Sequence, residues 1–231
     1  MKKGKKSRKR ISEGRKARKN SSARHRAGSR PRSRLRAHSH LHSSPSRAFI
    51  WFVRHAQAEG NERHIFNGSR IDAPLTSLGG AQAGYWAAHF PFKPDAILTS
   101  PLLRARQSAE PLSERFAMPA LSFPLAMEQD YGQLSGKSRD RLLGPRYRKY
   151  FHVSPSGQMY TLRAPGGESW GDLKERARKC LRWLDSHYAG KKVVVVSHSD
   201  FMNCAYGVRH RLDNHHVWMR EDVPNCGTVR L

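Results

Sequence analysis

The sequence predicts an α/β protein, namely a three-layer α/β/α sandwich around a mostly parallel sheet, preceded by a disordered basic tail. Three short apolar runs indicate the sheet, at residues 48–56, 94–101 and 191–200. They lack the alternation of half-exposed strands, so they are typical of strands buried on both faces. Segments with helical periodicity lie between these runs, and strands that alternate with helices favour a parallel sheet.

Composition sets the tail apart from the rest of the chain. Residues 1–47 hold 18 of the 43 Lys and Arg residues but only one acid, Glu13. They contain almost nothing apolar, so burial cannot offset the entropy lost on ordering, and we expect residues 1–46 to be disordered. Residues 47–231 are long enough for one domain with a core. This second part keeps about +8 of the net charge of +25, which suits an anionic substrate.

The first strand is AFIWFVRHA, at residues 48–56, and a polar loop follows it. Residues 75–90 then predict a helix that begins at Thr76 or Ser77, because both hydroxyls are suitable N-caps. The residues expected on the apolar face of this helix are Leu78, Ala81, Tyr85 and Ala88.

The later elements keep the order of strand and helix. The strand at 94–101 precedes a helical stretch at 104–117, which Pro111 weakens. Residues 137–165 are basic and show no clear period. Residues 168–189 predict the most regular helix. Glu168 could be catalytic, but we favour a role in capping this helix, since acids favour the first turn. The apolar stripe of this helix is Leu173, Ala177, Cys180, Leu181 and Leu184.

Cationic and imidazole side chains stand at the ends of the three predicted strands. Arg54 and His55 end the first, His198 ends the last, and Arg104 lies four residues after Ser100 at the end of the strand between them. Because the carboxyl ends of parallel strands meet at one edge, these side chains should share a pocket. Arginine presents a planar fork that matches phosphate, so the sequence predicts a phosphate site.

The ordered motifs resemble those of the histidine phosphatase superfamily, which shares its fold with phosphoglycerate mutases. The segment VRHAQAEGN resembles the family signature R-H-G-x-x-x-x-N. The segments that resemble further family motifs, in order, are PLTSLGGAQA, LTSPLLRARQSA, MEQDYGQLSG, PGGESW and VVVVSHSD. The resemblance covers residues 48 to about 227, which is essentially the whole predicted domain.

The resemblance implies a role for each matched residue. His55 would be the nucleophile that accepts the phosphoryl group, and Glu128 would donate a proton to the leaving oxygen. His198 would complete the catalytic set beside them. The residues that would bind phosphate are Arg54, Asn61, Arg104, Asn67 and Gly68.

The family activity suggested is hydrolysis of a phosphomonoester through a phosphohistidine, without a metal or other cofactor. Two small residues, Ala56 and Ser199, stand where relatives usually have Gly. Related mutases carry Arg directly after the acid glutamate, whereas this chain has Gln129, so phosphatase is favoured over mutase-type phosphoryl transfer. The alternative of another class is a polyanion- or RNA-binding protein that uses the fold as a scaffold.

The expected partners are a small phosphorylated substrate at the pocket and nucleic acid or another polyanion at the tail. The basic segment 136–151 could meet further substrate charge, although we favour a solvated lid there; its cations are Lys137, Arg139, Arg146 and Arg148. No run approaches the roughly 18 apolar residues of a membrane span. Three widely spaced cysteines fit a reducing compartment, so we expect an intracellular, cytoplasmic protein, with the nucleus as an alternative suggested by the tail.

Overall fold

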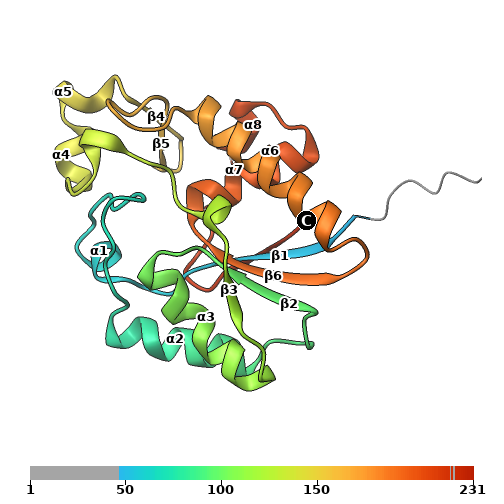
Figure 1. Cartoon of the computed structure of the whole chain (residues 1–231). Helices are drawn as coiled ribbons and strands as arrows, with labels where there is room; N and C mark the ends of the chain where they lie inside the picture. The colour runs from blue at the N-terminus through green and yellow to red at the C-terminus, as the bar shows by residue number, and fades with distance from the viewer. Residues whose placement is uncertain (1–46, 219, 221) are drawn as a thin grey trace, which may run out of the picture. The chain divides into compact units, whose positions relative to one another are not determined.

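The computed structural model describes residues 47–218, 220 and 222–231, so the predicted tail at residues 1–46 lies outside the described residues. Figure 1 shows the described elements around one central sheet. In chain order they are β1 (Phe49–Arg54), α1 (Glu59–Glu62), α2 (Ser77–Ala88), β2 (Ala96–Thr99), α3 (Leu103–Phe116), β3 (Ala120–Ser122), the 3-10 turns η1 (Pro124–Ala126) and η2 (Gly132–Leu134), α4 (Arg139–Leu143), α5 (Pro145–Arg148), β4 (Phe151–Val153), β5 (Met159–Thr161), α6 (Trp170–His187), β6 (Lys192–Ser197), α7 (Ser199–His210), α8 (Asn214–Trp218) and β7 (Thr228–Arg230).

The central sheet has the strand order β3-β2-β6-β1-β7. Strands β1, β2, β3 and β6 run parallel, and only β7 pairs antiparallel, on the outer side of β1. The three strands predicted from apolar runs are β1, β2 and β6, which lie side by side at the centre. The prediction of a mostly parallel sheet is confirmed.

The side chains of the central strands alternate between two helical layers. In β6, Val193 and Val195 pack in one core with α6, α7 and α8, while Val194 and Val196 pack in a second core with α2 and α3. All four valines are fully buried, which explains the continuous apolar run without alternation. Figure 1 shows these helices on opposite sides of the sheet, so the three-layer α/β/α arrangement is confirmed.

Helix α6 follows its predicted pattern except at its start. Its apolar stripe is buried as expected. The N-cap is Ser169, whose hydroxyl accepts a hydrogen bond from the Asp172 amide, while the Asp172 carboxylate accepts one from the Ser169 amide. The expectation that Glu168 caps this helix is therefore wrong, because Ser169 and Asp172 already form the capping box.

Helix α2 begins as predicted, since the Thr76 hydroxyl accepts a hydrogen bond from the Gly79 amide. The expected apolar face is wrong: Leu78 is 55% exposed and Tyr85 is 70% exposed. The buried face carries Gly79, Ala83 and Ala87. A side chain at Gly79 would lie 2.0 Å from the Gln57 carbonyl oxygen, so this helix packs through its small residues rather than its large apolar ones.

A smaller unit covers the carboxyl edge of the sheet and accounts for the segment in which the sequence showed no period. It comprises α4, α5 and the antiparallel pair β4–β5. Its own apolar cluster consists of Tyr131, Leu134, Leu142, Phe151, Met159 and Ala164. Across the described part of the chain, no helix is long and apolar enough to cross a membrane.

Candidate active site

The parallel pairing of β1 and β6 places the two predicted histidines together. Arg54 lies opposite Ser197 in the register, and the His55 amide continues the ladder with a 2.9 Å bond to the Ser197 carbonyl oxygen. His55 and His198 therefore follow neighbouring strand ends, and their ring centroids lie 5.1 Å apart. The sheet edge predicted from the apolar runs is the edge on which these rings meet.

The hydrogen bonds of His55 fix its tautomer. Nδ1 lies 2.7 Å from the Ala56 carbonyl oxygen, which can only accept, so Nδ1 carries the proton. Nε2 then holds a lone pair, and the Arg104 Nε–H donates to it at 3.3 Å. Burial and the Arg104 and Arg54 guanidiniums hold the pKa of His55 well below its ordinary value. The ring is thus neutral near pH 7, with its lone-pair nitrogen beside two cations.

His198 lies behind His55 and is fully buried, so its ring does not itself line the cavity described below. Its Nε2 is 2.8 Å from the Ser100 hydroxyl, at the end of β2. Its Nδ1 is buried and has no hydrogen-bond partner among the described residues. Burial, then Arg104, lowers the pKa of His198 well below its ordinary value. A hydroxyl proton donated to Nε2 would leave an Nδ1–H without an acceptor in this structure.

Arg104 is almost fully buried, with 2% of its surface exposed, and hydrogen bonds hold its guanidinium in place. Besides its bond to His55, it donates from Nη1 to the Ile71 carbonyl oxygen at 3.0 Å and from Nη2 to the Gly68 carbonyl oxygen at 2.8 Å. No salt bridge pairs it with a described carboxylate. Its positive charge is therefore fixed in place and not neutralised by a direct partner, as a phosphate site requires.

Arg54 is tied by one end only. Its Nη1 donates to Asp222 Oδ2 at 3.0 Å and to the Val223 carbonyl oxygen. Its Nε is buried and has no partner among the described residues. The Ser199 hydroxyl also donates to Asp222. Asp222 thus holds Arg54 at the rim of the site and leaves other guanidinium donors free for an anion.

The other predicted phosphate-binding residues, Asn61, Asn67 and Gly68, line one cavity with Arg54, His55 and Arg104, but they make different contacts. Asn61 uses its Oδ1 to accept a 3.0 Å bond from the Ala58 amide, which stabilises the turn into α1. Asn67 is buried and its Oδ1 has no partner among the described residues. Gly68 has a φ of 56° and contributes its carbonyl to Arg104, so it positions the guanidinium.

Glu128 enters the cavity from the loop after η1. Its Oε1 accepts bonds from the Gln129 amide at 2.9 Å and the Phe201 amide at 3.2 Å. Burial raises the pKa of Glu128 above its ordinary value. A carboxyl with a raised pKa can hold a proton for a leaving group.

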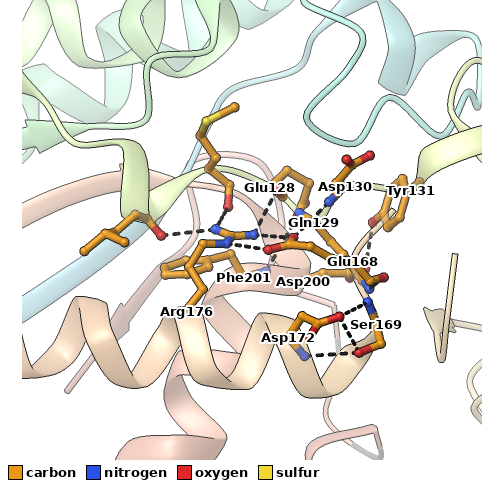
Figure 2. Close-up of polar contacts among 12 residues, drawn as sticks. Glu128, Gln129, Asp130, Tyr131, Glu168, Ser169, Asp172, Arg176, Asp200 and Phe201 are labelled. Carbon is orange, nitrogen blue, oxygen red and sulfur yellow. Dashed lines mark hydrogen bonds and ion pairs between the residues drawn. The ribbon is translucent and has the colours of Figure 1, made fainter. Parts of the chain in front are cut away.

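Figure 2 shows the network that supports the Glu128 loop from behind. Arg176 of α6 donates to the carbonyl oxygens of Leu125, Met127 and Glu128, at 3.1, 2.6 and 3.1 Å. The same guanidinium forms a forked pair with Glu168, at 2.8 and 2.7 Å. Glu168 is therefore a structural partner of Arg176, two turns before it in the chain.

One open cavity of about 280 Å³ joins these groups. Its lining includes all the predicted site residues except His198, and also acidic and aromatic residues that the sequence reasoning missed. These acidic and aromatic residues are Phe66, Tyr131, Asp200 and Asp222. Asp200 had a usable signal, because it stands two residues after His198 at a strand end. Asp222 had none, since it meets Arg54 only through the fold.

The basic segment contributes one side chain to the cavity. Arg139 lines it, whereas Lys137, Arg146 and Arg148 do not. Lys137 instead donates to the Gln133 carbonyl oxygen, and Arg146 lies over the Tyr147 ring. Within residues 47–218, 220 and 222–231, no three His, Cys, Asp or Glu side chains converge to hold a metal ion.

The family described as the histidine phosphatase superfamily (branch 1) matches residues 50–231. The chain belongs to this superfamily. It is 33% identical over 156 residues to a 2,3-bisphosphoglycerate-dependent phosphoglycerate mutase of Methylobacterium radiotolerans, covering 64% of this chain and 72% of that relative. It is 30% identical over 152 residues to the uncharacterized phosphatase PhoE of Bacillus subtilis, covering 64% of this chain and 70% of that relative.

Solved structures of other proteins share the fold. A mycobacterial glucosyl-3-phosphoglycerate phosphatase in complex with VO3 matches with a TM-score of 0.69 at 23% identity, over 80% of this chain and 92% of that one. A phosphoserine phosphatase of Entamoeba histolytica in complex with 3-phosphoglyceric acid matches with a TM-score of 0.68 at 22% identity, over 79% and 89% of the two chains. Mutases and phosphatases thus both occur among the similar proteins.

Proposed function

We propose that the protein is a phosphatase that hydrolyses a phosphomonoester through a covalent phosphohistidine on His55. The observation that carries the proposal is the state of His55. It is a buried, neutral imidazole whose Nδ1 proton is bound to the Ala56 carbonyl, so that Nε2 alone can attack. Arg54 and Arg104 stand beside it and can stabilise the charge that phosphoryl transfer spreads over the phosphate oxygens.

In the first step, Nε2 of His55 bonds to phosphorus while the bond from phosphorus to the ester oxygen breaks. Glu128 gives its proton to that oxygen, so the product leaves as an alcohol. In the second step, water attacks the phosphohistidine, Glu128 takes the proton from the water, and the bond from phosphorus to nitrogen breaks. Inorganic phosphate leaves, and His55 and Glu128 return to their starting states.

The placement of Gln129 supports hydrolysis over mutase-type transfer. A mutase must hold its phosphorylated intermediate for return of the phosphoryl group, which favours additional cations around the substrate. Gln129 is fully buried and donates from Nε2 to the carbonyl oxygens of Thr161 and Glu168, away from the cavity. It therefore adds no substrate contact at the position where related mutases carry Arg.

Two measurements test the proposal. Hydrolysis of a small phosphomonoester in ¹⁸O-labelled water should place one labelled oxygen in the released phosphate. Rapid quenching with ³²P-labelled ester should trap an acid-labile phosphoryl group on the protein. His55→Ala should abolish both turnover and labelling, whereas His216→Ala, which changes an exposed histidine, should alter neither.

The outcomes separate the alternatives. Interconversion of phosphoglycerates without phosphate release would favour the mutase and refute hydrolysis. Wild-type turnover without trapped phosphohistidine, together with an active His55→Ala variant, would refute the covalent mechanism.

A further inference from the structure

The cavity contains a second buried carboxyl group beside the proposed proton donor. Asp200 stands in the first turn of α7, is 5% exposed and lines the cavity together with Glu128. Figure 2 shows both side chains in the same part of the site. The two are linked through the backbone, because Glu128 accepts a bond from the Phe201 amide, which directly follows Asp200. The proposed chemistry does not use Asp200.

Each of these carboxyl groups has one oxygen engaged by the protein. Asp200 Oδ2 accepts a 2.7 Å bond from the Tyr131 hydroxyl, and Glu128 Oε1 accepts two backbone amides. Within the described residues, Asp200 Oδ1 and Glu128 Oε2 accept no hydrogen bond. Both oxygens have accessible surface, and both residues line the cavity, so these two oxygens are open to a ligand.

The charges around the cavity are unevenly arranged. The fixed guanidinium of Arg104 and the neutral ring of His55 define the end that receives phosphate. The wall beside Glu128 carries Asp200, whose carboxyl group accepts the Tyr131 hydroxyl, whereas Asp222 at the rim is already paired with Arg54. Since the proposed reaction places the ester oxygen beside Glu128, we expect the rest of the alcohol to pass Asp200, which lines the same cavity.

We propose that Asp200 determines substrate specificity by selecting phosphomonoesters whose alcohol carries a hydrogen-bond donor, a hydroxyl or an ammonium group, close to the ester oxygen. An anionic group at that place would meet the carboxyl group of Asp200 and lose affinity. The proposal rests on the proposed phosphatase activity and names its substrate class: aminoalkyl or polyol phosphates rather than phosphorylated carboxylic acids.

Four two- or three-carbon esters that differ in one terminal group provide the test. They are O-phosphorylethanolamine, 2-hydroxyethyl phosphate, propyl phosphate and 2-phosphoglycolate, which end in ammonium, hydroxyl, methyl and carboxylate. For the wild type, kcat/KM should be highest for the first two and lowest for 2-phosphoglycolate. One charge-assisted hydrogen bond corresponds to about a tenfold or greater preference for the ammonium ester over the methyl ester.

The variant Asp200→Asn keeps the size of the side chain and replaces one carboxyl oxygen, which can ionise and accept a hydrogen bond, with an amide nitrogen that only donates. It should raise the ratio of kcat/KM for 2-phosphoglycolate to that for O-phosphorylethanolamine by about tenfold or more. All four leaving groups are alkoxides that need a proton, so an effect on Glu128 slows all four esters, and the change in this ratio reports the specificity role. Asp213→Asn, which changes an exposed acid before α8, is the matched control and should leave the ratio unchanged.

A second readout does not depend on turnover. Calorimetric binding of the same four esters to His55→Ala, with and without Asp200→Asn, should show the same order of affinities. If the wild type hydrolyses none of the esters, the proposed function fails, while this binding order still tests Asp200. Should Asp200→Asn fail to fold, Tyr131→Phe removes the hydroxyl that holds Asp200 Oδ2 in place. It should weaken the same discrimination, because the carboxyl group is then no longer positioned.

Two results would overturn the inference. One is a wild type that prefers 2-phosphoglycolate or treats the four esters alike in both hydrolysis and binding. The other is an Asp200→Asn variant that is folded and keeps the wild-type ratio.

Discussion

Replacing Arg176 with Met should damage both stability and catalysis, because one guanidinium anchors the whole Glu128 loop. The side chain of Arg176 is 16% exposed and that of Glu168 is 23% exposed, so water replaces their bonds only in part. Met fills a similar volume but donates nothing. The change leaves three carbonyl oxygens and one carboxylate without their donor.

The expected loss follows from breaking a largely buried pair. Removing one partner of such a pair typically costs about 3–5 kcal/mol, and access of water to Glu168 places the estimate at about 3–4 kcal/mol. For a folded part of this size, that corresponds to a fall in Tm of about 6–16 °C. Because a loosened loop no longer holds Glu128 against the ester oxygen, kcat should fall more than KM rises.

Urea denaturation and steady-state kinetics measure the two effects. The double variant Arg176→Met/Glu168→Gln should recover about 1–2 kcal/mol relative to the single variant, since it removes the unpaired charge. Arg178→Met, whose partner Glu175 is exposed, is the control on the same helix and should leave the unfolding midpoint unchanged. An Arg176→Met protein that loses less than about 1 kcal/mol and keeps kcat would refute this reasoning.

Three further predictions concern catalysis and the tail. The pKa of Glu128 is raised, so the proton donor is lost only as pH rises through that raised value, and Glu128→Gln should remove the alkaline limb of the kcat/KM profile. Glu128→Gln should also slow alkyl esters far more than p-nitrophenyl phosphate, because p-nitrophenolate leaves without a proton. Equal slowing of both substrates would contradict this role. Activity should survive a chelator because Arg54 and Arg104 supply positive charge, and a rate restored only by a divalent ion would contradict that view. Deleting residues 1–46 should leave the kinetics with a small ester unchanged while it weakens salt-sensitive binding to RNA, and the reverse result would place the tail in the site.

The parts of the site that could be predicted are those with a local sequence signal. His55, His198 and Arg104 each follow a continuous apolar run, and the rule that parallel strands end at one edge brings them together. The sheet core was predictable for the same reason, because valines in β6 face helices on both sides.

The other features of the fold and the site depend on contacts between distant segments, which no local sequence pattern reveals. The predicted apolar face of α2 is wrong because Gly79 lets the helix approach the Gln57 carbonyl closely. The face with the small residues is therefore buried, although the opposite face carries larger apolar side chains. The ion pair of Arg54 with Asp222 joins residues far apart in the chain. The prediction that Glu168 caps α6 is wrong because its carboxylate pairs instead with Arg176, eight residues later in the chain. An acid just before a helix does not by itself reveal such a pair.

Strand β1 is synthesised early, whereas the two strands that pair with it, β6 and β7, come near the end of the chain. In the sheet it lies between β6 and β7, and the His55 carbonyl accepts a bond from the Asn225 side chain. During synthesis, the apolar strand that carries the nucleophile therefore leaves the ribosome long before either neighbouring strand exists. Such non-local pairing slows folding and exposes an unpaired edge to aggregation or to chaperones. A nascent chain that ends before β6 should be inert towards phosphoesters, and activity should arise only when β6 and β7 close around β1.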